Sequence, residues 1–299
     1  MERVAGHEDR GQAKPTLYVV ATPIGNLQDI TFRALEIFRH VDVIAAEDTR
    51  ITTRLLNHYG IAAKKLIPLH QHNEQRSVPG VIAALEAGRS VALASDAGTP
   101  AFSDPGARLV HAVRAAGFPV VPIPGANAAA AALSASGLAG AHFLFYGFLP
   151  ARAAERRKEI GMLAALPWTL VFYEAPHRVI ESVTDLAAEL GALRRIVIAR
   201  ELTKLFESIH ACELGNAAPW LAAHPDRIRG EFVLLIEGAQ PDQDTAMIEA
   251  KRVLDILLEE LPVRQATALT ARITGARKNE LYALALEMKA APSAVNGKR

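Results

Sequence analysis

Short apolar runs alternate with helical patterns through the first half of the chain. Residues 16–22 (TLYVVAT), 90–95 (SVALAS) and 119–125 (PVVPIPG) are typical of strands, and each precedes a stretch with helical spacing of apolar residues. Parallel strands need crossover connections, usually helices, so this alternation predicts a mostly parallel α/β sheet. We expect another strand at 41–49 and helices at 29–41, 52–59, 77–88, 105–117 and 126–137.

The pattern changes at residues 143–150 (FLFYGFLP), where a second α/β unit is expected to begin. A basic helix, a strand and another helix follow, and two further strands are separated by a break at residues 213–230. This arrangement predicts a mixed sheet. The expected strands are 143–150, 169–176, 194–203 and 231–239, and the expected helix between them is 177–190.

The last part of the chain is predicted to be helical. Three amphipathic stretches follow a polar segment at residues 240–245, and Gly275 separates the last two. Glycine tolerates a positive φ, as a helix-turn-helix requires at this place. We therefore predict a disordered tail at 1–14, α/β domains at 15–141 and 142–240, a linker at 240–245, and a helical segment at 246–290.

Composition limits the classes of protein to which the chain can belong. Half of its 299 residues are apolar and its net charge is +1, which suits a folded core. The single cysteine, Cys212, excludes a disulfide framework and a multi-cysteine zinc site, and it favours a reducing cytoplasmic compartment. The longest uncharged stretch, around residues 125–140, is rich in alanine rather than leucine, so we expect no membrane span.

Two basic clusters stand out against the near-neutral total. One holds Arg152, Arg156, Arg157 and Lys158, and the other holds Arg264, Arg272, Arg277 and Lys278. Either cluster alone is compatible with a solvated helix face. Two such clusters in one chain favour an acidic partner.

Unusual loops follow four of the predicted strands. They are residues 21–29 (ATPIGNLQD), 45–50 (AAEDTR), 95–106 (SDAGTPAFSDPG) and 122–128 (PIPGANA). Ligands of open α/β sheets bind at the carboxyl ends of strands, so a ligand is expected here. No G-x-G-x-x-G follows the first strand and no P-loop motif occurs, which argues against a dinucleotide or P-loop site.

The glycines and prolines of residues 95–106 predict a tight loop that can bind a small polar ligand through its main chain. Asp96 and Asp104 can accept hydrogen bonds from a ligand or cap the following helix, and we favour the capping role for Asp104. Asn127 can likewise cap a helix or form a second wall of the same pocket.

These segments together resemble the tetrapyrrole-methylase superfamily. The resemblance covers residues 16–290 and rests on the order of ATPIGNL, AAEDTR, HNE, SDAGTPAFSDPG, PGANAAAAALSASGL, GFLP, YEAPHR, ARELTK and GEFVLLIEG. Within the superfamily, the chain resembles the members that methylate 16S ribosomal RNA of the small subunit. It implies two α/β domains with S-adenosylmethionine in the cleft between them, a homodimer, a helix-turn-helix segment at the end, and 2′-O-methylation of a cytidine ribose in the decoding region.

The resemblance also implies site residues. Contact with the cofactor is expected for Pro23, Asp96, Gly98, Thr99, Phe102, Ser103, Asn127, Ala128, Tyr173, Glu174, Arg200 and Glu231. Candidate bases for the ribose hydroxyl are the carboxylates Asp29, Glu47, Asp48 and Glu174. Candidate RNA contacts are Arg50, Arg54, Asn73, Arg156, Arg157, Arg277 and Lys278.

No metal site is expected. His70 and His72 lie two residues apart without a third ligand nearby, which is a weak signal for a metal site. Asn73 and Glu74 are expected to line the RNA side or a subunit contact. Two other functions stay open. One is methylation of a tetrapyrrole precursor, and the other is a non-catalytic RNA-binding role in ribosome assembly.

Overall fold

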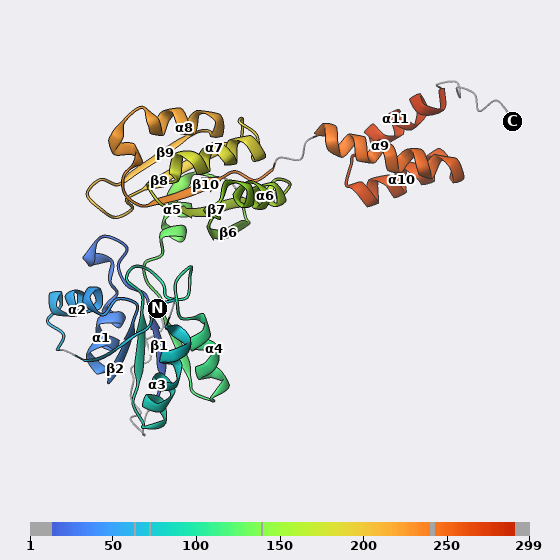
Figure 1. Cartoon of the computed structure of the whole chain (residues 1–299). Helices are drawn as coiled ribbons and strands as arrows, with labels where there is room; N and C mark the ends of the chain where they lie inside the picture. Colours follow the sequence, from blue (N-terminus) through green and yellow to red (C-terminus); the bar gives the residue numbers. More distant parts are fainter. Residues whose placement is uncertain (1–13, 63, 72, 139, 240–242, 291–299) are drawn as a thin grey trace, which may run out of the picture. The chain divides into compact units, whose positions relative to one another are not determined.

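The structure is a computed structural model that describes residues 14–62, 64–71, 73–138, 140–239 and 243–290. The predictions made for residues 1–13 and for His72 therefore lie outside the described residues. The chain forms two compact units (Figure 1). The first ends at Glu237, and the second begins at Gly238 and takes in Ala165–Pro167.

The first sheet is parallel throughout, which confirms the α/β prediction for this half. Its strand order is β3-β2-β4-β1-β5, and Leu17 of β1 pairs with Val91 of β4 and Val120 of β5. The strands are β1 (Leu17–Val20), β2 (Val43–Ala46), β3 (Lys65–Pro68), β4 (Val91–Ala94) and β5 (Val120–Ile123). The sequence did not predict β3, because this edge strand lacks the buried apolar run of the central strands.

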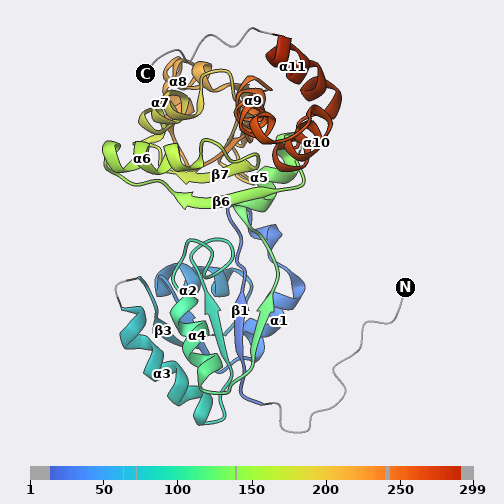
Figure 2. The same cartoon turned by 90° about the vertical axis from the view of Figure 1, so that its right-hand side faces the viewer.

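Alternating residues of these strands bury opposite faces of the sheet. In β4, Ala92 packs in a cluster with Phe38, whereas the neighbouring Leu93 packs in another cluster with Leu109. Figure 2 shows strands β1 and β3 of this sheet together with its helices α1 to α4. The first cluster includes α1 (Phe32–His40) and α2 (Thr49–His58), and the second includes α3 (Glu74–Glu86) and α4 (Ala107–Ala115).

The second sheet is mixed, as predicted. Its order is β6-β7-β10-β8-β9; β6 and β7 are parallel, and the remaining pairs are antiparallel. The strands are β6 (Phe143–Phe148), β7 (Thr169–Glu174), β8 (Arg195–Arg200), β9 (Ser208–Glu213) and β10 (Phe232–Ile236). The expected break at 213–230 instead contains α8 (Leu214–Ala222), whose internal Pro219 weakened the helical pattern.

Helices cover both faces of the second sheet. The alanine-rich segment forms α5 (Ala128–Ser136), and Ala129 and Ala132 pack closely on Val171, Val197 and Val233. The helices α6 (Ala153–Leu163), α7 (Val179–Leu190) and α8 form the other layer (Figure 1). Among the described helices, none combines the length and apolarity that a bilayer crossing needs.

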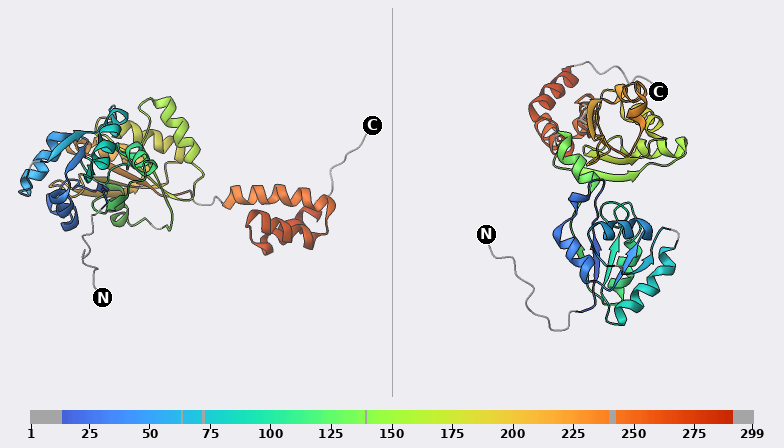
Figure 3. Two further views of the ribbon diagram at one scale, coloured as in Figure 1. Left: turned by 90° about the horizontal axis from the view of Figure 1, so that it is seen from below. Right: turned by 90° about the vertical axis from the view of Figure 1, so that its left-hand side faces the viewer.

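The second unit is a bundle of three helices, α9 (Gln243–Glu260), α10 (Val263–Thr274) and α11 (Lys278–Ala290), shown together in Figure 3. Its core includes Leu254, Ala266 and Leu281. Gly275 ends α10 with a φ of 74°, which confirms the predicted turn. Because α9 begins at Gln243, the linker prediction is wrong for residues 243–245, and residues 240–242 lie outside the described residues.

Candidate active site

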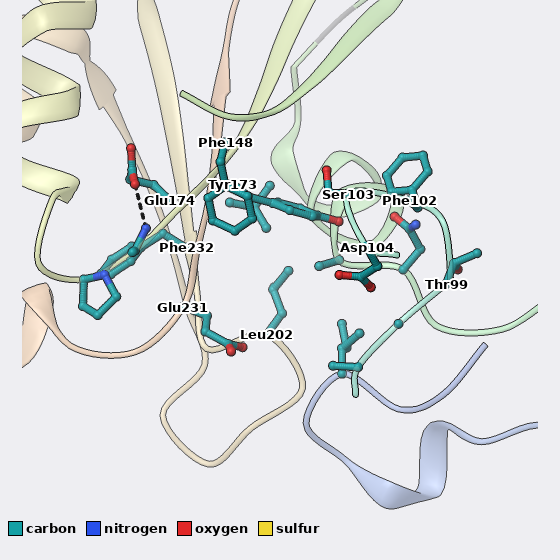
Figure 4. A pocket seen from close by; sticks show the side chains of 18 residues that line it. Thr99, Phe102, Ser103, Asp104, Phe148, Tyr173, Glu174, Leu202, Glu231 and Phe232 are labelled. Carbon is teal, nitrogen blue, oxygen red and sulfur yellow. Dashed lines mark hydrogen bonds between the residues drawn. The ribbon is translucent and has the colours of Figure 1, made fainter. Parts of the chain in front are cut away.

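A cavity of about 370 Å³ lies in the first unit, within the size range of ligand pockets (Figure 4). Loops that follow β1, β4 and β5 form one side of the cavity, and residues at the ends of β6, β7, β8 and β10 form the other. The cavity therefore lies at the carboxyl ends of the parallel strands, where the sequence predicted a ligand site.

The loop at residues 95–106 is fixed by main-chain hydrogen bonds. Thr22 and Gly98 each donate a backbone N–H to the other's carbonyl, at 2.9 and 3.0 Å. The Thr99 hydroxyl donates to the carbonyl of Ala126 at 3.1 Å. These bonds tie the loop to the end of β1 and to the segment before α5, so three walls of the cavity are joined.

Strained backbone is concentrated in two loops that line the cavity. The non-glycine residues with positive φ in the described part of the chain are Ala101, Ser103, Glu201 and Thr203. Gly147 has a φ of 84°, and a Cβ at this position would lie 2.8 Å from the Ser103 Oγ. Strain of this kind persists where the surrounding structure enforces it, and it is frequent at functional sites.

Asp104 does not cap the following helix, so that prediction is wrong. The helix α4 begins at Ala107 after Gly106, and its N-terminal backbone N–H groups donate to the Glu74 carboxylate instead. Asp104 lines the cavity. Burial raises the pKa of Asp104 to about 6, and the charge of Glu47 adds to this effect.

The role of Glu74 explains the HNE segment. One Glu74 oxygen accepts from Gly106 and Arg108 at 3.0 Å and from Leu109 at 3.2 Å. The neighbouring Asn73 side chain accepts from the backbone of His70 and donates to the carbonyl of Pro68. Both side chains thus hold their own part of the fold, and Glu74 is too buried to serve as a surface contact.

Three more carboxylates lie at the ends of β2 and β4. The Asp96 carboxylate accepts from the backbone of Asp48 at 2.9 Å, and the backbone of Asp96 donates to Glu47 at 3.3 Å. Burial raises the pKa of Glu47 and of Asp96. Hydrogen bonds from Arg50 hold the pKa of Asp48 well below its usual range. Asp48 is therefore a poorer proton acceptor than Glu47.

Aromatic rings form the other side of the cavity. Phe102 stacks on Phe145 at 4.2 Å between ring centroids, and Tyr173 forms T-shaped contacts with Phe145 and Phe148 at centroid distances of 4.9 and 5.7 Å. The Tyr173 hydroxyl accepts from the backbone of Ala129 at 3.3 Å. Figure 4 shows this hydroxyl and the Asp104 carboxylate directed into the same part of the cavity. Phe148 remains 54% exposed.

Glu174 and Arg200 are already bound within the protein. The buried Glu174 carboxylate pairs with Arg178 at 3.1 Å and accepts from Ser182 and the backbone of Ala175. Arg200 donates to three backbone carbonyls, including that of Phe206 at 3.0 Å. These contacts make Glu174 a weak candidate base and give Arg200 the role of shaping the loop after β8.

The structure brings most of the predicted cofactor residues together. Lining the cavity are Gly98, Thr99, Phe102, Ser103, Asn127, Ala128, Tyr173, Glu174 and Glu231, whereas Pro23, Asp96 and Arg200 do not line it. Asn127 also caps α5, because its side chain accepts from the backbone of Ala130 at 3.0 Å. Other residues also line the cavity although they were not predicted to contact the cofactor, among them Ile24, Asp104, Phe148, Leu202, Phe232 and Val233.

The missed residues divide into two kinds. Asp104 belongs to the loop at residues 95–106, which the sequence did single out, but a helix-capping role was preferred to a ligand contact for this residue. Phe148, Phe232 and Val233 belong to apolar strands, and nothing in such a strand distinguishes a residue that faces a cavity from one that faces the core. Only the arrangement of the strands reveals these residues.

The predicted RNA contacts differ in accessibility. Arg50 is 81% exposed, and Arg54, Arg157, Arg277 and Lys278 are also exposed. Arg156 is only 2% exposed, and its guanidinium pairs with Asp185 at 2.7 Å. The prediction that Arg156 contacts RNA is therefore replaced by a structural role, since the side chain joins α6 to α7 and offers no surface to a ligand.

No group of three or more His, Cys, Asp or Glu side chains among the described residues is arranged to hold a metal ion. His72, one of the two histidines considered for such a site, lies outside these residues. Asp29 ends a short 3₁₀ helix (Leu27–Asp29) and is exposed, and it does not line the cavity.

The chain is similar in sequence to proteins named ribosomal RNA small subunit methyltransferase I. It is 47% identical to the one from Escherichia coli O157:H7 over 283 residues, which cover 95% of this chain and 99% of that protein. It is 51% identical to the one from Pseudomonas aeruginosa over 274 residues, which cover 91% of this chain and 97% of that protein.

Family and structural comparisons agree on the fold. The uroporphyrin-III C-methyl transferase of Thermus thermophilus, solved in complex with S-adenyl homocysteine, superposes with a TM-score of 0.52 at 17% identity and covers 74% of this chain and 96% of that one. The RsmI C-terminal HTH domain matches residues 244–289. Because the family model for tetrapyrrole (corrin/porphyrin) methylases matches residues 16–218, the chain belongs to the tetrapyrrole methylase family.

Proposed function

We propose that the chain transfers a methyl group from S-adenosylmethionine to small-subunit ribosomal RNA, at the ribose 2′-hydroxyl of a cytidine in the decoding region. The observation that supports it most is the 47–51% identity, over more than nine-tenths of the chain, to proteins named for methylation of this RNA. The family resemblance supports the ribose hydroxyl and the cytidine.

The chemistry of the cavity suits this cofactor. S-adenosylmethionine has an aromatic base, a polar amino-acid end and a positively charged sulfonium. The cavity offers the rings of Tyr173 and Phe148, the polar side chains of Ser103 and Asn127, and the carboxylate of Asp104. Aromatic faces and carboxylates both favour a cation. A neighbour of the same fold was solved with S-adenyl homocysteine, which differs from this cofactor by the transferred methyl.

When bound, S-adenosylmethionine supplies an activated methyl group. The residues of the chain then have two tasks, to align the hydroxyl oxygen with the methyl carbon and to accept the hydroxyl proton. The strained loop at residues 95–106 serves alignment, because its main chain is fixed to β1 and to the segment before α5.

Asp104 is the carboxylate placed best to accept the proton. It lines the cavity, and a pKa of about 6 leaves it ionised at neutral pH but more basic than an ordinary aspartate. Glu47 is the second candidate, because burial also raises its pKa. Asp48 and Glu174 are bound by arginines, and Asp29 lies away from the cavity lining.

The RNA is proposed to contact the exposed cations Arg50, Arg54, Arg157, Arg277 and Lys278, which suit phosphate groups. Asn73 is also proposed as an RNA contact, although its side chain already bonds to the backbone of His70 and Pro68. A homodimer is proposed on the family resemblance. A cytoplasmic location is proposed because the ribosome is the expected partner.

The test is methyl transfer from labelled S-adenosylmethionine to small subunits isolated from cells that lack this modification. Nuclease mapping locates the label, and resistance to alkaline cleavage at the adjacent 3′ phosphate identifies a 2′-O-methyl ribose. A single labelled cytidine with that resistance supports the proposal.

Other outcomes separate the alternatives. Cofactor binding without any label in RNA, together with transfer to a tetrapyrrole precursor, assigns the chain to a small-molecule methylase. RNA binding without measurable cofactor binding assigns it to the non-catalytic assembly role. Either result contradicts the proposed function.

A further inference from the structure

One face of α11 is buried and the neighbouring face is open. Leu281 and Ala285 are fully buried in the core of the second unit. Asn279, Tyr282 and Leu286 follow a spacing of three and four residues, which places them together on the open face. Tyr282 is 42% exposed and Leu286 is 50% exposed. An aromatic ring is thus presented to solvent from a rigid helix.

The segment that leads into this helix is strongly basic. Residues 262–279 contain four cations, Arg264, Arg272, Arg277 and Lys278, and no acidic residue, and all four are exposed. Lys278 precedes Tyr282 by one helical turn. Arg277 contacts Glu280 at 3.5 Å, but both side chains are exposed, and such a pair contributes little. The Arg277 guanidinium can therefore exchange this partner for a phosphate.

We infer that this open face, formed by Asn279, Tyr282 and Leu286 with the cations Arg277 and Lys278, binds single-stranded RNA. The cations contact phosphates, and the ring of Tyr282 stacks on an unpaired base. The inference rests on the proposed function and deepens it, because it names the kind of RNA structure that the second unit recognises.

The ring and the charges favour an unpaired strand over other partners. Base faces are covered in a duplex, whereas single strands let bases stack on aromatic side chains. A duplex therefore leaves Tyr282 without a partner. A protein partner for Leu286 has to accept the cations Arg277 and Lys278 at the start of the same helix, whereas a nucleic acid strand supplies complementary charge along its whole length.

The first experiment measures binding of the full chain to a short fluorescein-labelled single-stranded RNA by fluorescence anisotropy. Tyr282→Leu keeps apolar bulk and loses the aromatic ring, so we expect affinity to fall about tenfold. Tyr282→Phe keeps the ring and serves as the matched variant, with affinity close to that of the original chain. Neither change alters the dependence of affinity on salt, because no charge is removed.

The second experiment tests the phosphate contact. Lys278→Gln should reduce the slope of log affinity against log salt concentration by about 0.7, the value for one phosphate contact on a single strand. Lys251→Gln removes an exposed cation from α9 in the same unit, and we expect the slope to stay unchanged. Thermal unfolding and S-adenosylmethionine binding, measured on each variant, confirm that the fold is retained.

The outcomes distinguish this inference from the proposed function. Unchanged affinity in Tyr282→Leu, or equal affinity of the original chain for a duplex of the same sequence, overturns the inference. Self-association that Tyr282→Leu abolishes without changing RNA affinity assigns the face to a second copy of the chain and also overturns it. Loss of RNA affinity in Tyr282→Leu supports the inference even if the original chain methylates no RNA, a result that contradicts only the proposed function.

Discussion

Asp104 combines a place in the cavity with a pKa raised to about 6, so its two protonation states are expected to have different effects on activity. A base must be ionised to accept a proton, and methyl transfer should therefore decline as the pH falls through about 6. Asp104→Asn should lower the methyl-transfer rate by about two orders of magnitude. If calorimetry finds the same cofactor affinity in the variant and in the original chain, the lost rate belongs to the methyl-transfer step and not to cofactor binding.

The matched variant for this test is Asp96→Asn, since Asp96 belongs to the same loop and does not line the cavity. We expect it to keep the decline near pH 6, even if removal of its contact with Asp48 lowers the rate. An Asp104→Asn variant with an unchanged rate and pH profile would exclude Asp104 as the base and leave Glu47 as the candidate.

The same raised pKa affects stability. Burial moves the pKa of Asp104 from 3.8 to about 6, so the folded chain binds a proton over a pH range in which the unfolded chain has released it. The contribution of Asp104 to the stability of the fold is therefore largest below the lower pKa of 3.8, and it is lost as the pH rises through about 6. At neutral pH, Asp104→Asn should raise the free energy of unfolding by about 1 kcal/mol after allowance for solvent screening.

Chemical denaturation at pH 7 and at pH 4 checks this sign. The gain from Asp104→Asn should be present at the higher pH and nearly absent at the lower, where the aspartate in the folded chain is itself protonated. A stabilisation of equal size at both values would show that its cause is not the charge of Asp104.

At the scale of single elements, strand β6 is shaped to receive the loop after β4. Its register shifts between Phe145 and Gly147, and Gly147 has a positive φ where the Ser103 hydroxyl approaches. Gly147→Ala should lower the free energy of unfolding by about 2 kcal/mol and weaken cofactor binding, because both strain and a close contact are introduced. Denaturation and calorimetry measure the two effects.

Gly88 provides the control. Its φ of 79° resembles that of Gly147, but no atom lies within 4 Å of a Cβ placed on it. Gly88→Ala therefore introduces backbone strain without a collision, and it should cost about 1 kcal/mol and leave cofactor affinity unchanged. Equal effects of both substitutions on cofactor binding would contradict a specific role for the contact with Ser103.

Helices α6 and α7 are joined by a buried ion pair rather than by apolar contacts alone. Arg156 is buried and bonds to Asp185, which also accepts from the more exposed Arg157 at 2.6 Å. Arg156→Met leaves the buried carboxylate without its inner partner and should destabilise the chain by about 3 kcal/mol. Arg157→Met should cost less than about 1 kcal/mol.

This pair of variants also separates structure from RNA binding. In RNA binding at a temperature where both variants are folded, Arg157→Met should weaken affinity and Arg156→Met should not. The reverse order would restore Arg156 as an RNA contact and contradict the role assigned from its burial.

For the whole molecule, sequence patterns predicted what depends on local periodicity. Strands β1, β4 and β5 are short apolar runs followed by glycine- and proline-rich loops, and these were placed correctly. The edge strands β3 and β9 were missed, because each is only partly buried and lacks the continuous apolar run of the central strands. Such a strand is difficult to distinguish from a loop in a single sequence.

The cavity, too, could be predicted from the sequence only where local patterns mark it. Its glycine-rich loop was recognised because Gly98 and Gly106 mark a tight turn at a strand end. The identity of Asp104 as a lining residue was not, because an aspartate before Pro105 fits helix capping equally well. Burial of Glu74 under the first turn of α4 decides between these roles, and only the folded chain brings these two segments together.

The two compact units make a final prediction about RNA affinity possible. Arg50 belongs to the first unit and Lys278 to the second. Substitutions at independent sites have additive effects on free energy, so Arg50→Gln and Lys278→Gln should each reduce the salt dependence of RNA binding, and the double variant should show the sum of both changes. Anisotropy titrations at several salt concentrations measure this. A double variant no weaker than either single variant would contradict the independence of the two contacts, because loss of one contact would then already abolish the other.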